Sequence, residues 1–411
     1  MTTLADSQGR SALARDSQVI GLVGAGHAIS HFAQLLLVPL FPWLRDAFQV
    51  SYTQLGILMT VTSLSSCLVQ AGSGFLVDRI GTRSVLFGGM LLIGLASCSF
   101  AVSQTYAMLL IGSVVLGVGA GIFHPVDYTL LNHRVSAPRL GYAYSFHGIC
   151  GMLGFALAPI LMVPIAQLYS WRAALLTAGL VTFGVLALML LNRDKLDFKP
   201  ARTAAPSSET RAPKENSFAF LRIAAVWSCL GFFFIYAVNA IVMQAFAPEA
   251  ARQLHTLPLS LSATNLTLYL LANGAGMVMG GYFASRTEHS ERIVGICFGL
   301  AAALSLVLAS AALSPFLVSV LFTLMGLAVG NAGPSRDLLI KRSTPANASG
   351  RVYGVVYSGL DIGAGIAPLI FGPLLDQHHY SGVFYGLALV QAILILGALN
   401  VRRSRRPALA S

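Results

Sequence analysis

The chain has 411 residues, of which 56% are hydrophobic and only 10% are charged. A soluble domain usually carries about 25% charged residues, so this composition excludes a soluble globular protein and predicts an all-α polytopic membrane protein. The net charge of +11 at pH 7 is also typical of proteins that bind nucleic acids, so the positions of the basic residues matter.

Twelve apolar segments of about 20 residues, the length with which a helix crosses a bilayer, follow one another in the chain. The first six lie near residues 18–42, 53–76, 84–104, 106–131, 141–167 and 171–192. The second six lie near residues 219–245, 259–284, 292–313, 315–340, 351–375 and 381–401. Between the two sets, the polar stretch 193–217 is rich in Pro, Ser and charge, which predicts a flexible linker.

The domain organisation expected from these segments is a pair of six-helix bundles. It comprises a cytoplasmic tail (1–17), a first bundle (18–192), the cytoplasmic linker (193–217), a second bundle (218–401) and a basic cytoplasmic tail (402–411).

The basic residues gather on one side of this predicted topology. With the N-terminus in the cytoplasm, only Arg45, Arg172 and Arg252 of the 26 Lys and Arg residues fall outside. This distribution follows the positive-inside rule, and an inverted chain would violate it. We therefore interpret the net charge as a topological signal and expect a lipid bilayer, not a nucleic acid, as the partner.

The five cysteines occur singly in apolar segments, with no CxxC pair and no Cys/His cluster at metal-ligand spacing. This pattern favours small apolar side chains in helix packing over disulfides or a resident metal.

An internal repeat is visible at an offset of 209 residues. Gly121, Pro125, Gly141, Tyr144, Gly154 and Pro159 recur as Gly330, Pro334, Gly350, Tyr353, Gly363 and Pro368. Six matches on Gly, Pro and Tyr at one fixed offset indicate two parallel halves related by an axis along the membrane normal.

A compact charged turn separates the second and third apolar segments, and its residues are Gly74, Asp78, Arg79, Gly81 and Arg83. A weaker copy, 281–286, appears 207 residues later, with Ser285 where the first copy has an acidic residue. With the halves and the linker, this turn resembles the loop between helices 2 and 3 of the major facilitator superfamily, and the resemblance covers essentially the whole chain. It implies the twelve-helix major facilitator fold, with two bundles related by pseudo-two-fold symmetry.

The segment 121–125, followed by 148–154 and Pro159, looks most like the fosmidomycin-resistance group of exporters within that superfamily. This resemblance implies a monomeric secondary transporter in the bacterial inner membrane, with protons and a small-molecule solute as partners and efflux as the direction. Ser113 stands where many proton-coupled members carry an arginine, so the usual account of proton coupling does not transfer directly. The resemblance assigns the charged turn to gating, with Asp78 as a latch.

Polar side chains inside the first bundle mark a candidate site, because a charge or imidazole in hydrocarbon needs a partner, a cavity or a function. His27, His31 and Gln34 share one face of the first segment, in a cavity or in helix packing. His124 and Asp127 are one turn apart, so Asp127 is expected to orient the His124 imidazole for proton binding.

Residues in the fifth segment are expected to extend this first-bundle site. Tyr144 and His147 approach His124 and Asp127 from the same predicted side. Depth counting places His27 near the membrane centre, but His124 and Asp127 nearer the cytoplasm. A gating role for that pair therefore competes evenly with a solute-binding role.

In the second half, Asp361 follows Tyr357 by one helical turn. It is the only carboxylate of that half that lies near the middle of an apolar segment when residues are counted along the segment. We predict that it carries the coupling proton, against a structural hydrogen bond as the alternative. Neutral phenols and amides are suited to orienting a polar solute, and the candidates are Tyr236, Asn239, Tyr269 and Asn273. Arg336 either contacts an anionic solute or only pairs with Asp337.

The leading hypothesis is therefore a secondary transporter of a small polar or anionic solute, working by alternating access. Alternatives are an uptake carrier for an organic anion and a carrier of a transition metal or its chelate. The metal hypothesis is motivated by the four histidines and weakened by the absence of clustered Cys or Met ligands. No nucleophile–base pair, nucleotide-binding loop or cofactor motif is visible in the sequence, so neither an enzyme nor a cofactor is expected.

Overall fold

The computed structural model of the chain describes residues 2–198, 223–286, 289–310, 313–343 and 350–405. Every regular element in these ranges is helical. The chain divides into two compact units. Unit 1 comprises Met1–Gln49 and Leu64–Arg202, and unit 2 comprises Val50–Ser63 and Thr203–Ser411.

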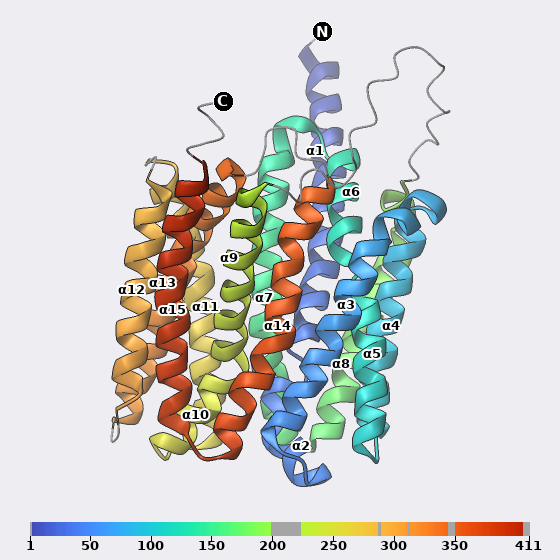
Figure 1. Cartoon of the computed structure of the whole chain (residues 1–411). Coiled ribbons are helices and arrows are strands. Elements are labelled where there is room, and N and C mark those ends of the chain that lie inside the picture. The colour runs from blue at the N-terminus through green and yellow to red at the C-terminus, as the bar shows by residue number, and fades with distance from the viewer. Residues whose placement is uncertain (1, 199–222, 287–288, 311–312, 344–349, 406–411) are drawn as a thin grey trace. The chain divides into compact units, whose positions relative to one another are not determined.

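Unit 1 contains most of the helices of the first half (Figure 1). They are α1 (Thr2–Gln34), α2 (Phe41–Phe48), α3 (Tyr52–Ile80), α4 (Thr82–Val102), α5 (Tyr106–Ala120), α6 (Phe123–Arg134), α7 (Leu140–Leu168) and α8 (Trp171–Leu191), with the short helices η1 (Val38–Leu40), η2 (Ala137–Arg139) and η3 (Arg193–Lys195). The first part of α3 belongs to unit 2, so the boundary between the units does not coincide with a loop.

Unit 2 contains the remaining helices, shown from green-yellow to red in Figure 1. They are α9 (Ala224–Ile241), a π-helical turn η5 (Val242–Phe246), α10 (Ala247–Leu254), α11 (Leu259–Ala284), α12 (Ser290–Leu308), α13 (Pro315–Ser343), α14 (Gly350–Asp376) and α15 (Tyr380–Arg405). Arg193 to Phe198 are the described part of the predicted linker, and the rest of that segment lies outside the described residues.

Two predicted boundaries differ from the structure. The predicted tail 1–17 is part of α1, which starts at Thr2. The predicted fourth span is divided into α5 and α6, with Pro125 in the first turn of α6. Proline is tolerated there because the first amides of a helix have no partner in the preceding turn.

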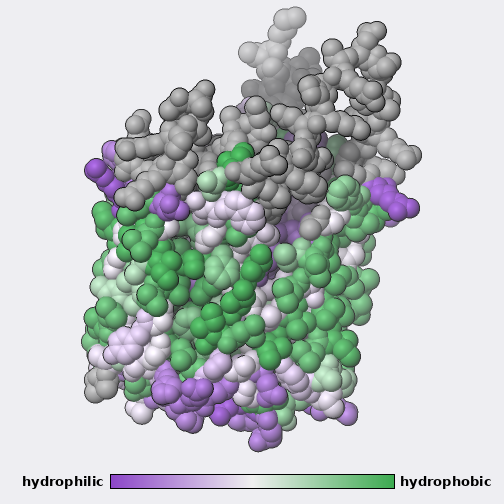
Figure 2. Space-filling model, viewed as in Figure 1, coloured by the Kyte–Doolittle hydropathy of each residue, from purple (hydrophilic) through white to green (hydrophobic). Residues whose placement is uncertain are grey.

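Eleven helices of the described chain are long and apolar enough to cross a membrane. The remaining predicted span corresponds to α11, which has 26 residues but carries Asn265, Asn273 and several glycines that lower its hydropathy. In Figure 2 the visible faces of both units are mostly hydrophobic along the helices, and hydrophilic residues gather at the lower helix ends. The protein is thus a multi-pass membrane protein.

Two of the repeated glycines, Gly154 and its counterpart Gly363, lie where helices approach closely. A methyl group at Gly154 of α7 would overlap the Ala28 carbonyl of α1, and one at Gly363 of α14 would overlap the Phe234 carbonyl of α9. Gly154 thus allows the close packing of α7 on α1, whereas Gly148 of the same helix faces open space. The repeat therefore preserves equivalent helix contacts in the two halves.

Gly154→Ala is expected to destabilise the protein by about 1–3 kcal/mol, because the added methyl group must push α7 away from Ala28. Gly148→Ala in the same helix is the matched control, since no atom lies within 4 Å of a methyl group there. Thermal unfolding in detergent, followed by circular dichroism, measures both. Equal midpoints for the two variants would contradict the packing role of Gly154.

Candidate functional site

A buried carboxylate joins two histidines in the interior of unit 1. Asp127 of α6 is fully buried, and its Oδ2 lies 3.1 Å from Nδ1 of His27 and 3.0 Å from Nε2 of His147. The two rings stack with centroids 3.5 Å apart, and both are almost completely buried. Helices α1, α6 and α7 thus bring together residues separated by up to 120 positions in the sequence.

Two further imidazoles surround this pair. The His31 centroid lies 4.4 Å from that of His27, and the His124 centroid lies 5.2 Å from it. His124 is also 6.3 Å from His147. We refer to these four histidines together with Asp127 as the histidine cluster.

The histidine cluster has unused hydrogen-bonding capacity among the described residues. Both ring nitrogens of His31 and the Oδ1 atom of Asp127 are buried without a hydrogen-bond partner there. Leaving such a group unsatisfied costs about 1–3 kcal/mol. Gly151 leaves room for the rings, because a methyl group there would lie 3.1 Å from Nε2 of His27. These features are typical of a site that binds a ligand, a proton or water.

The structure corrects the expected partner of Asp127. The described hydrogen bonds of Asp127 go to His27 and His147, whereas the prediction paired it with His124. The predicted difference in depth between His27 and His124 is wrong as well, because their rings are in contact. Depth was counted from the ends of apolar runs, but α1 starts far before its run and the fourth span is broken at α6.

The predicted approach of His147 to Asp127 is confirmed, but two other candidates lie apart from this carboxylate. Tyr144 is exposed and donates its hydroxyl hydrogen to Asn132. Gln34 is the last residue of α1, with an exposed side chain. Neither side chain has a described contact with Asp127.

The sequence prediction missed two aromatic neighbours of the histidine cluster. Phe155 packs edge-on against His31 with centroids 4.4 Å apart, and Tyr128 lies 5.3 Å from His147. Tyr128 is one helical turn after His124, so helical periodicity offered a signal for it.

In unit 2, Arg336 of α13 lies over the ring of Tyr236 of α9, with its guanidinium carbon 4.1 Å from the centroid. Its Nε donates to Oδ1 of Asp337 at 2.8 Å, and the arginine side chain is only 12% exposed. A cation held on an aromatic face and largely desolvated is well placed to meet an anion.

The other predicted residues of unit 2 occupy different environments. Asn239 is fully buried and accepts a hydrogen bond from Gln391 at 3.1 Å. Tyr269 and Asn273 are buried one turn apart on α11. Asp361 is partly buried on α14. The side chain of Tyr357 lies outside the described residues.

The predicted gating turn leads from α3 into α4. Gly81 has φ 86°, a conformation that favours glycine, and it directly precedes α4. Gly74 and Arg79 are exposed, and the side chain of Asp78 lies outside the described residues.

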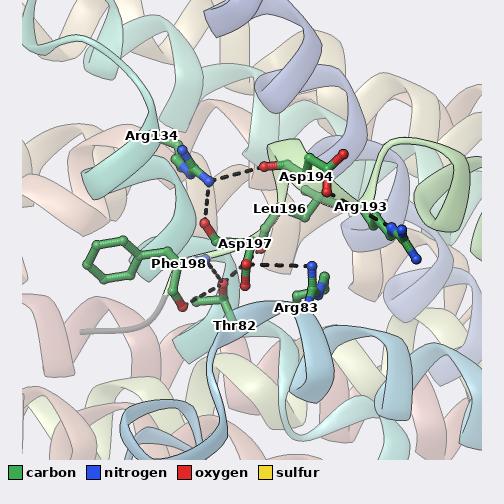
Figure 3. Close-up of polar contacts among 8 residues, drawn as sticks. All are labelled: Thr82, Arg83, Arg134, Arg193, Asp194, Leu196, Asp197 and Phe198. Atoms are coloured by element: carbon green, nitrogen blue, oxygen red, sulfur yellow. Dashed lines mark hydrogen bonds and ion pairs between the residues drawn. The ribbon is translucent and has the colours of Figure 1, made fainter. Parts of the chain in front are cut away.

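The start of the linker is bound to this turn (Figure 3). The Thr82 amide donates to the Phe198 carbonyl at 2.9 Å, and the Phe198 amide donates to the Thr82 hydroxyl at 3.0 Å. Arg83 pairs with Asp197 at 3.5 Å, and the Arg134 guanidinium donates to the carbonyls of Asp194 and Asp197. The linker start therefore ties the α3–α4 turn to the end of α6.

Thr82→Val is expected to release this linker start. The variant keeps the shape of the side chain but loses the hydroxyl bonds to Phe198 and Leu196, each with a net value of about 0.5–1.5 kcal/mol. Hydrogen exchange of residues 193–198 should become about tenfold faster.

Thr177→Val is the matched control, because the described hydrogen bond of its hydroxyl goes to Ala173 of its own helix. Unchanged exchange in Thr82→Val, measured by mass spectrometry, would contradict the attachment of the linker.

Known transporters are similar in sequence to most of this chain. The fosmidomycin resistance protein of Escherichia coli (strain K12) is 22% identical over 366 residues, which cover 86% of each chain. The probable sulfoacetate transporter SauU of Cupriavidus necator is 22% identical over 414 residues, covering 93% of this chain and 94% of that protein. The probable L-galactonate transporter of Escherichia coli (strain K12) is 22% identical and covers 82% of this chain and 78% of that protein.

A solved structure shows the same fold at low sequence identity. The crystal structure of a bacterial homologue of the human lysosomal transporter Spinster, in an inward-facing and occupied conformation, superposes with a TM-score of 0.73 at 13% identity. The match covers 95% of this chain and 97% of the other. The predicted fold class is therefore confirmed. The Major Facilitator Superfamily model matches residues 23–241 and 228–411, and the chain belongs to this family of membrane transporters.

Proposed function

We propose that the protein is a proton-coupled secondary transporter that exports a small polar or anionic organic solute across the bacterial inner membrane by alternating access. Membership of the superfamily makes it a transporter and not an enzyme. The solute class, the coupling ion and the direction are the parts that we propose.

The observation that carries the proton coupling is the burial of Asp127 between His27 and His147. An ionised carboxylate in a low-dielectric interior costs several kcal/mol unless a positive charge or a proton accompanies it. Imidazole is the side chain that gains and loses a proton most readily near neutral pH. A proton shared in the histidine cluster, and released when the site becomes hydrated, would link proton movement to the conformational cycle.

An anionic solute is supported by two independent observations. Two relatives are named for galactonate and sulfoacetate, which are organic anions. In unit 2, Arg336 supplies a largely buried positive charge beside Tyr236. We propose that Arg336 contacts the anionic group and that Tyr236, Tyr269 and Asn273 orient the solute.

We also propose a gate in unit 1 and a second proton-binding site in unit 2. The charged turn with Gly74, Asp78, Arg79, Gly81 and Arg83 acts as the gate, and Asp361 is a second site of proton uptake and release in unit 2. The protein acts as a monomer, with both termini in the cytoplasm.

The test uses the purified full chain in liposomes with an acidic interior, supplied outside with labelled sulfoacetate, L-galactonate or fosmidomycin. A proton antiporter should accumulate one of these solutes above its external concentration, and a protonophore should abolish the accumulation. Accumulation only with an acidic exterior would reverse the proposed direction. If accumulation were unaffected by the gradient and the protonophore, proton coupling would be wrong.

A further inference from the structure

Three histidines of unit 1 lie close enough together to act as metal ligands. His27, His124 and His147 each offer a ring nitrogen, and these three atoms all lie within 4.8 Å of one another. They come from α1, α6 and α7, which fix them in space independently. We infer that these three histidines form a binding site for a divalent transition-metal ion of the zinc and nickel class.

Metal binding requires the three nitrogens, which lie within 4.8 Å of one another, to approach further. It also requires the stacked rings of His27 and His147 to turn, because an imidazole binds a metal in the plane of its ring. Zinc binds imidazole nitrogen at about 2.0–2.1 Å, which places tetrahedral ligand atoms roughly 3.3 Å apart. His124 is more exposed than the two stacked rings of His27 and His147, so its rotation can bring the third nitrogen inward. Three protein ligands leave the fourth coordination position open to water, a solute or a carboxylate.

The charge of the site favours a cation. Asp127 is fully buried, and its described hydrogen bonds are to His27 and His147 alone. When both imidazoles are neutral, a metal dication supplies the positive charge that the carboxylate otherwise lacks. Metal-bound histidines are commonly oriented by such a carboxylate, and the unpartnered Oδ1 of Asp127 is available as a further ligand.

The donor set also selects the class of metal. Imidazole suits zinc, nickel, copper and iron, whereas magnesium and calcium prefer oxygen ligands. No cysteine belongs to this group in the described part of the chain, so the set lacks the thiolates that select copper(I). An ion bound here occupies the space around Asp127 and therefore competes with the proton of the proposed transport cycle.

The test is isothermal titration calorimetry of the full chain in nanodiscs, without a histidine tag, with zinc chloride and nickel chloride as the probes. One ion is expected to bind per chain, with magnesium chloride giving no heat of binding. His147→Ala and His124→Gln should each weaken binding about tenfold or more, and zinc should raise the unfolding temperature of the wild type but not of these two variants.

His133→Ala is the matched control, because His133 lies on α6 but stacks on Phe198, away from Asp127. It should bind zinc as the wild type does. No binding by the folded wild type would overturn the inference, and so would equal binding by all variants or equal weakening in His133→Ala.

The calorimetry involves no transport, so the two proposals can fail separately. One zinc ion bound by protein that shows no gradient-dependent solute accumulation would overturn the proposed function and leave the metal site standing. Gradient-driven transport by protein that binds no zinc would do the reverse.

Discussion

Asp127→Asn is expected to abolish solute accumulation driven by a pH gradient while solute exchange without a gradient continues. Asparagine has nearly the same size and can still bond one of the two imidazoles, so the fold should persist. It cannot exchange a proton with His27 and His147, which share one oxygen of the native carboxylate. Coupling free energies of about 1–3 kcal/mol correspond to a loss of roughly one to two orders of magnitude.

The measurement compares accumulation and counterflow in the same liposomes. Asp46→Asn is the control, because Asp46 is exposed at the end of α2 and should leave both activities unchanged. Wild-type accumulation in Asp127→Asn would show that the histidine cluster does not couple proton movement to transport. A loss of counterflow together with accumulation would instead assign Asp127 to solute binding or folding.

Asp361→Asn is expected to have the second largest effect, again sparing exchange and abolishing gradient-driven accumulation. Asp361 lies partly buried on α14 between Gly359 and Gly363, two residues that pack directly on the α9 backbone. A carboxylate on such a tightly packed helix changes its hydration when the helix moves, and its proton affinity changes with it.

Asp46→Asn is again the control for this variant, because Asp46 is exposed on α2. Both variants are assayed in liposomes with an imposed gradient and in counterflow. Wild-type accumulation by Asp361→Asn would leave Asp127 as the only proposed coupling carboxylate.

The sequence was sufficient to predict the fold class, because the features that indicate this class can be recognised along the chain without knowing how the helices pack. The lengths of the apolar segments predict the membrane spans. The internal repeat at an offset of 209 residues reflects helix contacts that both halves make. Gly154 and Gly363 illustrate this, since each allows a close approach to a carbonyl group of a neighbouring helix. Such steric requirements can be recognised in a single sequence.

The partners within the candidate site were less predictable, because they depend on how three helices rotate against one another. The sequence placed His27 and His147 among the candidates, but not on the same oxygen of Asp127. The contact of Thr82 with Phe198 had no sequence signal at all, since it joins the first residue of α4 to a residue 116 positions away. One of its bonds joins two backbone groups and another uses the Thr82 hydroxyl. Packing, not periodicity, determines these contacts.

The most direct test of proton coupling measures protons and not solute. Full-length protein is reconstituted in liposomes that contain a trapped pH-sensitive dye, and a solute that the chain transports is added outside. Solute should drive proton movement across the membrane in the wild type and in Asp46→Asn, but not in Asp127→Asn. Solute entry at full rate without any proton movement in the wild type would contradict the central claim.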